Sequence, residues 1–254
     1  VYRGRKEGLR FTAQAIGGAL CLTGDNIEVK KHIDKPQGEF WAYQTDGSYD
    51  IKDCSSAAHI YGKRIASGEA FTDAKYSHKP HDIKNLADYA CAFGINEFVV
   101  CASAYQPSLT DIPGNTANGR QYCLNRNNTF WELSKPMWDS QARCNYMLRQ
   151  GEPVVDLGVY LGDEVPIRII SHRLPEIPAG FNFDAFTTDA LMSMTVDNAG
   201  MITLPSGMKF TAITLPDAEF KESIRKKIAE LKKAGARVYE PAANESLATF
   251  LQSN

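Results

Sequence analysis

The chain has 254 residues, of which 43% are hydrophobic and 23% charged, as is ordinary for a soluble globular protein. This length provides for one large or two ordinary domains. The formal net charge is −2 and the pI about 6.2, so charge supports neither a nucleic-acid partner nor an anionic membrane surface. No apolar run approaches the roughly 20 residues that a membrane-spanning helix requires.

The cysteines, the histidines and the first residues of the chain indicate its thiol chemistry and its processing. The six cysteines form no CxxC pair, and several lie in apolar stretches. We therefore expect reduced, buried thiols rather than a disulfide framework or a zinc site. His78 and His81 form an HxxH pattern on a predicted loop, which alone is weak evidence for zinc. The chain begins at Val1 without a secretory signal, so we expect a processed or partial chain.

Short apolar segments in the first half are typical of buried parallel strands. They cover Leu9–Ala15, Arg64–Ala70 and Ile95–Cys101, with a shorter strand possible near Gly38–Trp41. Two segments between them predict helices over Ser48–Tyr61 and Asp82–Phe93, each followed by a glycine that ends it. This alternation predicts a parallel α/β arrangement, either an open sheet or the later strands of a (β/α)8 barrel.

The second half predicts another α/β unit after a long loop. The loop runs from Pro107 to Asn128, and a helix that ends at Gly151 follows it. Further strands are predicted over Val154–Leu161, Lys209–Leu215 and Ala236–Tyr239, with a helix between the last two. We divide the chain at residue 150. Residues 1–150 are predicted to hold later barrel strands and helices, and residues 151–254 an incomplete flavodoxin-like domain.

Glu69 and Glu39 are the candidate catalytic residues. Glu69 lies at the carboxyl end of a predicted strand, where ligands of parallel α/β folds bind. Glu39 precedes Phe40 and Trp41, and a carboxylate beside an aromatic ring is typical of sugar sites. Two such carboxylates suit glycoside hydrolysis, in which one protonates the leaving oxygen and the other activates water. The alternatives are a capping or surface acid for Glu69, and a turn acid beside core aromatics for Glu39.

Polar and aromatic side chains elsewhere are candidates for sugar binding. Two of them follow the predicted strand Ile95–Cys101, and three lie in the cluster Arg-Asn-Asn-Thr-Phe-Trp of residues 126–131. Amides and a guanidinium hydrogen-bond hydroxyls, and indole rings stack on sugars. The substrate-binding candidates are Trp41, Tyr105, Gln106, Arg126, Asn127 and Trp131. The alternative is that the cluster caps a helix and fills a core.

Eight ordered segments carry a family resemblance. They are Gly38–Trp41, Ser56–Lys63, Ala66–Thr72, Gly94–Val99, Arg126–Glu132, Ala142–Leu148, Gln150–Asp156 and Leu204–Met208. Together they resemble glycoside hydrolase family 106, which includes α-L-rhamnosidases. The segments that carry Glu39 and Glu69 are the most specific of the eight.

The resemblance implies a large, secreted or periplasmic enzyme with a (β/α)8 catalytic barrel. Such an enzyme would hydrolyse terminal α-L-rhamnosides of plant or microbial polysaccharides with inversion, using paired glutamates. The resemblance implies that Glu69 is a catalytic glutamate, as the base, and that Glu39 is a second acid of the site. It also implies calcium near the sugar, although no cofactor is evident from the sequence itself.

The resemblance has gaps and departures. A further catalytic acid is expected on an earlier strand outside this chain, and the rest of the parent chain would complete the barrel. Because that acid would be missing, this chain alone should have little activity. Gln14 stands where many relatives have an acid, and Ala102–Pro107 lacks an expected histidine. These changes leave open a non-catalytic carbohydrate-binding or scaffold relative.

Overall fold

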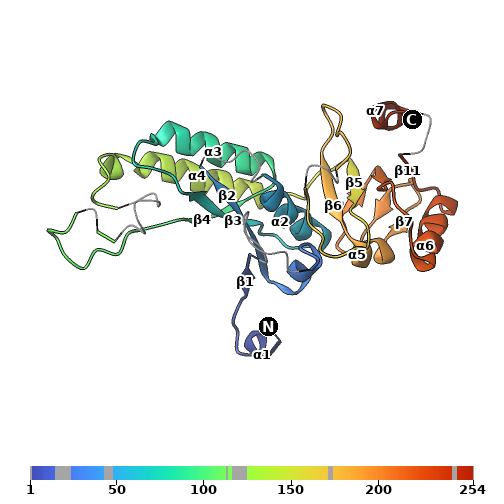
Figure 1. Ribbon diagram of the computed structural model, residues 1–254, viewed down its shortest axis with the longest axis horizontal. Helices are drawn as coiled ribbons and strands as arrows, with labels where there is room; N and C mark the ends of the chain where they lie inside the picture. Colours follow the sequence, from blue (N-terminus) through green and yellow to red (C-terminus); the bar gives the residue numbers. More distant parts are fainter. Residues whose placement is uncertain are drawn as a thin grey trace.

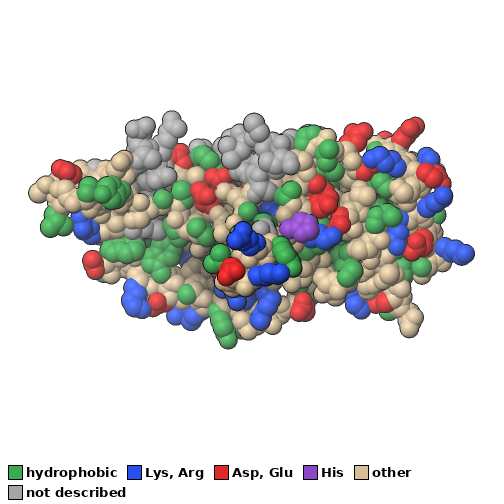
Figure 2. Space-filling view, turned by 90° about the horizontal axis from the view of Figure 1, so that it is seen from below, with side chains coloured by type: hydrophobic (Ala, Val, Ile, Leu, Met, Phe, Trp, Pro, Cys, Tyr) green, Lys and Arg blue, Asp and Glu red, His purple; other side chains and the backbone are tan. Residues whose placement is uncertain are grey.

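The computed structural model describes residues 2–14, 24–42, 48–112, 114–115, 125–170, 174–241 and 245–253. Two parallel sheets, each with helices beside it, make up most of this part of the chain (Figure 1). The predicted parallel α/β arrangement is therefore confirmed. On the face that Figure 2 shows, acidic and basic side chains are interspersed, in keeping with the small net charge.

The first sheet contains four parallel strands in chain order. They are β1 (Thr12–Ala13), β2 (Lys35–Trp41), β3 (Ser67–Thr72) and β4 (Glu97–Val100). The helices α2 (Ser48–Ile60), α3 (Pro80–Ala92) and α4 (Lys135–Leu148) follow β2, β3 and β4. The possible short strand near Gly38 proves to be a full strand of seven residues.

One face of this sheet packs against α2 and α3. Phe40 and Ala70 share a buried core with Ile51 of α2 and Ile83 of α3. Gly38 allows the close approach of α2, because a Cβ at this position would lie 2.6 Å from the carbonyl oxygen of Asp50. A larger side chain would thus push α2 off the strand that carries Glu39.

The second sheet has the strand order β11-β10-β5-β6, with all neighbours parallel. Its strands are β5 (Leu157–Tyr160), β6 (Phe183–Phe186), β10 (Ala212–Thr214) and β11 (Val238–Tyr239). The accompanying helices are α5 (Thr188–Ser193), α6 (Glu222–Lys233) and α7 (Leu247–Gln252). Strand β6 was not predicted from the sequence, whereas helix α6 was.

The single strand predicted over Lys209–Leu215 is wrong, because the chain changes sheets at Thr211. Residues before it form β9 (Lys209–Phe210), which belongs to an antiparallel sheet with β7 (Thr195–Val196) and β8 (Ile202–Thr203). The amide of Thr211 then donates to the carbonyl of Asp156 at 2.9 Å, and this bond turns the chain into the parallel sheet. Phe210 of β9 and all three residues of β10 are buried, so the apolar pattern runs through the break.

Helix α2 joins the two sheets. Its residues Ile51 and Cys54 belong to the core of the first sheet, whereas Ala57 and Ile60 belong to the core of the second. Figure 1 shows α2 between the first sheet and β6. The division of the chain at residue 150 stays a prediction, since the two cores share this helix.

Three short helices and the free cysteines are the remaining features of the described residues. The remaining elements are α1 (Tyr2–Lys6), the 3₁₀ helix η1 (Glu28–His32) and the 3₁₀ helix η3 (Trp131–Leu133). The described cysteines carry free thiols. Cys54 is buried as predicted, Cys91 and Cys101 are partly buried, and Cys144 is exposed, contrary to prediction. Cys21 and Cys123 lie outside the described residues. Cys144 is exposed because it lies on α4, which has no buried residue. In the described residues, no helix combines the length and apolarity needed to cross a membrane.

Candidate active site

Glu39 and Glu69 lie side by side on neighbouring strands. The two residues are paired in the parallel register of β2 and β3, and Val99 of β4 is the next partner across the sheet. Paired residues of adjacent strands point to the same face and have Cα atoms about 4.8 Å apart. The structure thus brings together two acids that are 30 positions apart in the sequence.

The two carboxylates point away from the helices. Side chains alternate along a strand, and Phe40 and Ala70, the next residues after each glutamate, face α2 and α3. Glu39 is 9% exposed, and Glu69 is partly exposed. Glu39 is the fifth of seven residues in β2 and Glu69 the third of six in β3, so the strand-end position predicted for Glu69 is wrong, because β3 continues to Thr72.

A bulge in β3 aligns a hydroxyl with Glu69. The register shifts from Glu39 opposite Glu69 to Trp41 opposite Thr72, so β3 contains one extra residue. The extra residue is accommodated at Phe71, whose φ of 64° is unusual for a bulky side chain. The shift turns Thr72 to the face of Glu69, and its hydroxyl donates to Glu69 Oε1 at 3.4 Å.

The thiol of Cys101 also contacts Glu69. Burial, a hydrogen bond to Glu69 and the charge of that carboxylate raise the pKa of Cys101 to about 11. The thiol is therefore protonated near neutral pH and can donate to the carboxylate. The Cys101 backbone is fixed in turn by a bond from its amide to the Ala70 carbonyl at 3.0 Å. Thr72 and Cys101 together orient Glu69, and neither was among the residues predicted for the site.

Glu39 is supported from behind by a buried polar network. The backbone amide of Glu39 donates to Asp50 Oδ2 at 2.7 Å. Burial raises the pKa of Asp50 to about 7 and that of Asp53 to about 6, although Lys30 opposes both shifts. Asn26 donates to Asp53 at 2.8 Å, and the buried Lys30 ammonium donates to the Asn26 carbonyl at 3.0 Å. Asp50, in the first turn of α2, thus ties this helix to β2, whereas Asp53 ties it to Asn26 and to the backbone amide of Ile169.

The predicted substrate-binding residues lie in two different places. Trp41 ends β2 next to the glutamates, opposite Thr72. Tyr105 is 72% exposed and bridges to Asn115, and Gln106 follows it. The segment after β4 runs outward from the sheet as a long excursion (Figure 1). The roles of Tyr105 and Gln106 in binding stay predictions.

The cluster of residues 126–131 makes local contacts. Arg126 is exposed and donates to the Ser108 carbonyl at 3.2 Å. The amide of Asn127 bonds to Asn125 in a tight turn, and Trp131 begins η3. These contacts are the capping and turn functions that were the alternative to sugar binding, so the roles of Arg126, Asn127 and Trp131 in binding also stay predictions.

No metal site is formed by the residues that the structure describes. These residues include no group of three or more histidine, cysteine, aspartate or glutamate side chains placed to hold an ion. Calcium also binds backbone and amide oxygens, so the calcium implied by the family resemblance stays a prediction, and we assign it no step. Gln14, which follows β1, has a buried Nε2 with no hydrogen-bond partner among the described residues.

Comparisons with known proteins agree with these observations. A family model described as alpha-L-rhamnosidase, glycoside hydrolase family 106, matches residues 3–251. A protein of Formosa agariphila named "putative beta-glucuronidase" is 32% identical over 241 residues, which cover 92% of this chain and 20% of that protein. The solved structure of a rhamnosidase from Novosphingobium sp. PP1Y matches with a TM-score of 0.74 and 23% identity, over 84% of this chain and 21% of that one.

The chain thus spans about a fifth of the length of both relatives. The structural likeness shows a shared fold, and the family match covers nearly the whole chain. The predicted resemblance is confirmed. The chain belongs to glycoside hydrolase family 106, the family of alpha-L-rhamnosidases.

Proposed function

We propose that the protein carrying this chain hydrolyses terminal α-L-rhamnosides, with Glu69 as the general base. The observation that carries the proposal is the register that sets Glu39 beside Glu69 on the face of the first sheet opposite the one that packs against α2 and α3. Membership of the rhamnosidase family supports the substrate class. The hydrogen bond from Thr72 supports a fixed orientation of the base.

The distance between neighbouring strands indicates which catalytic role each glutamate can have. An inverting hydrolase places its acid and base about 6.5–9.5 Å apart on opposite sides of the glycosidic bond. Glu39 and Glu69 start from Cα atoms about 4.8 Å apart on one face, which favours an approach to the sugar from the same side. We therefore assign Glu69 to the activation of water and Glu39 to binding beside it. The acid that protonates the leaving oxygen would then come from a strand outside this chain.

The experiment is substitution of the base in the full-length protein. With an aryl α-L-rhamnoside as substrate, Glu69→Gln should lower kcat by roughly 10²–10⁴-fold, the usual contribution of a general base. Proton NMR of the first product should show the inverted anomer in the unchanged protein. Glu222→Gln, an exposed acid on α6, serves as the matched control. Unchanged turnover by Glu69→Gln would refute the assignment.

The fold proposal has two parts. We infer that β1 to β4 are consecutive later strands of a (β/α)8 barrel, since they are parallel, in chain order and alternate with helices. We infer that the second sheet belongs to a flavodoxin-like domain. Its strands lie in the order β6-β5-β10-β11, which is second, first, third and fourth along the chain. Flavodoxin-like sheets have this order.

One relative favours a second candidate substrate. The Formosa protein is named for β-glucuronide cleavage, so we consider a β-glucuronide as the alternative. Assays with aryl α-L-rhamnoside and aryl β-D-glucuronide in parallel separate the two. A kcat/KM at least tenfold higher for the glucuronide would transfer the proposal to that substrate.

A further inference from the structure

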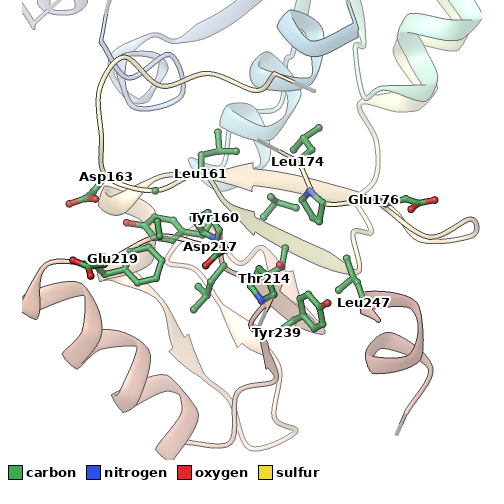
Figure 3. Close-up of a pocket in the computed structure, with 18 of the residues that line it drawn as sticks. Tyr160, Leu161, Asp163, Leu174, Glu176, Thr214, Asp217, Glu219, Tyr239 and Leu247 are labelled. Atoms are coloured by element: carbon green, nitrogen blue, oxygen red, sulfur yellow. The ribbon is translucent and has the colours of Figure 1, made fainter. Parts of the chain in front are cut away.

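A second cleft opens at the carboxyl edge of the second sheet, away from the glutamate pair. It has a volume of about 860 Å³, within the range of small-molecule sites, and is lined by the ends of β5, β10 and β11 and the segments after them. Tyr160, Phe220 and Tyr239 form aromatic parts of its wall, and Leu161 and Leu247 form apolar parts. Figure 3 shows the side chains of Tyr160, Leu161, Tyr239 and Leu247 around one hollow.

The cleft lies where the topology of the sheet reverses. From β5 the chain continues to β6 on one side, and later returns to β10 on the other side of β5. The segments after β5 and β10 therefore diverge and leave a crevice between them. In open parallel sheets, ligands bind at this switch point.

Carboxylates surround the cleft, and no lysine, arginine or histidine is among the described residues that line it. The carboxylates are those of Asp163, Glu164, Glu176, Asp217 and Glu219. Asp163 is paired with Lys221 at 2.8 Å. In Figure 3, Asp163 and Glu219 lie on one side of the cleft and Glu176 on the opposite side. This arrangement disfavours a phosphate or any other anion, and it offers hydrogen-bond acceptors at both ends of a bound molecule.

A buried hydroxyl in the wall lacks a hydrogen-bond partner in the part of the chain that the structure describes. Thr214, at the end of β10, is 1% exposed, and its Oγ1 forms no hydrogen bond with the described residues. Figure 3 shows Thr214 in the middle of the lining, between Asp217 and Tyr239. Buried hydroxyls are nearly always hydrogen-bonded, so each exception requires an explanation. A ligand hydroxyl that reaches this position would supply the missing partner.

We propose that this cleft is a second carbohydrate-binding site, specific for an uncharged sugar. A neutral sugar presents donor hydroxyls in several directions, which match the acceptors on both sides of the cleft. Its C–H faces match the aromatic and aliphatic wall. A uronic acid would be repelled by the carboxylates, and a simple amine would satisfy acceptors on one side alone. The location of the site is independent of Glu39 and Glu69, so it does not require the hydrolytic function proposed above.

The test is binding to the full-length protein with methyl α-L-rhamnoside as the probe. Hydrogen–deuterium exchange should show protection of residues 215–221 in addition to any protection near Glu69. Thr214→Val should weaken binding at this cleft by about five- to tenfold, the loss of one hydrogen bond. It should leave kcat/KM for an aryl rhamnoside unchanged. It should not lower the melting temperature, because the hydroxyl that it removes has no partner among the described residues.

Thr187→Val is the matched control. Thr187 is also fully buried with an unpaired Oγ1 among the described residues, but it does not line the cleft. This variant should leave the protection of residues 215–221 unchanged. Absence of that protection, equal effects of the two variants on it, or protection by glucuronate or spermidine instead of the rhamnoside would each overturn the proposal. An inactive enzyme that still shows the protection would refute the hydrolytic function alone.

Discussion

Removal of the Asp184 carboxylate should destabilise the protein where α2 meets the second sheet. Asp184 is fully buried on β6, and it accepts bonds from Lys52 Nζ at 3.0 Å, Ser56 Oγ at 3.0 Å and His59 Nδ1 at 2.7 Å. Burial alone would raise the pKa of Asp184, but the charges of Lys52 and His59 outweigh it and hold the pKa well below its usual range. Asp184→Ala leaves the Lys52 ammonium, 4% exposed, without this partner.

The expected cost is about 3–5 kcal/mol, the usual cost of breaking a buried ion pair by deleting one member. For a unit of this size the melting temperature should fall by on the order of 10 °C. The carboxylate stabilises the protein above pH about 4 and stops doing so as acidification protonates it, so the difference between the variant and the parent should shrink below that pH. Differential scanning calorimetry across pH 2.5–7 measures both effects.

The control is Asp88→Asn, which removes an exposed helix pair with Lys84. Such a pair contributes little, so the melting temperature should change by less than about 2 °C. If Asp184→Ala melts within about 2 °C of the parent, the buried cluster does not join the two sheets in the way described.

Three further predictions concern the support of the site. Because the pKa of Asp50 is raised to about 7, its ionisation lowers the free energy of unfolding as the pH rises from about 4 to 7. In Asp50→Asn, the urea midpoint should therefore fall less steeply with pH over this range. An equally steep fall in the variant and the parent would contradict this. Gly38→Ala should cost about 1–3 kcal/mol in urea unfolding, whereas Gly151→Ala, with open space around its Cβ, should be nearly neutral. Native labelling with a thiol reagent, read by mass spectrometry, should modify exposed Cys144 quickly, and labelling of Cys54 at a similar rate would contradict the burial that raises its pKa to about 12.

The helices beside the first sheet could be predicted because their signals are local. The structure ends α2 and α3 just before Gly62 and Gly94, which have φ values of 65° and 94° that other residues rarely adopt. The placement of Glu39 and Glu69 on strands could be predicted for a similar reason, since each glutamate follows a glycine and precedes apolar residues. Periodicity and turn chemistry are sufficient where neighbouring residues decide the structure.

The features that were missed depend on distant partners. Strand β6 contains Asp184, and a charged residue argues against a buried strand unless its partners more than 120 positions away are known. The break at Thr211 results from a bond to the Asp156 carbonyl, which no local pattern reveals. The β3 bulge that turns Thr72 toward Glu69 likewise depends on the register with β2.

The central claim is that Glu39 and Glu69 serve one sugar, and a double-mutant cycle tests it most directly. The kcat/KM for an aryl α-L-rhamnoside would be measured for Glu39→Gln, Glu69→Gln and the double variant of the full-length protein. Residues that act on one substrate as a unit are strongly non-additive. We predict that the double variant is little worse than Glu69→Gln alone, and fully additive losses, or no loss from either single change, would contradict the shared site.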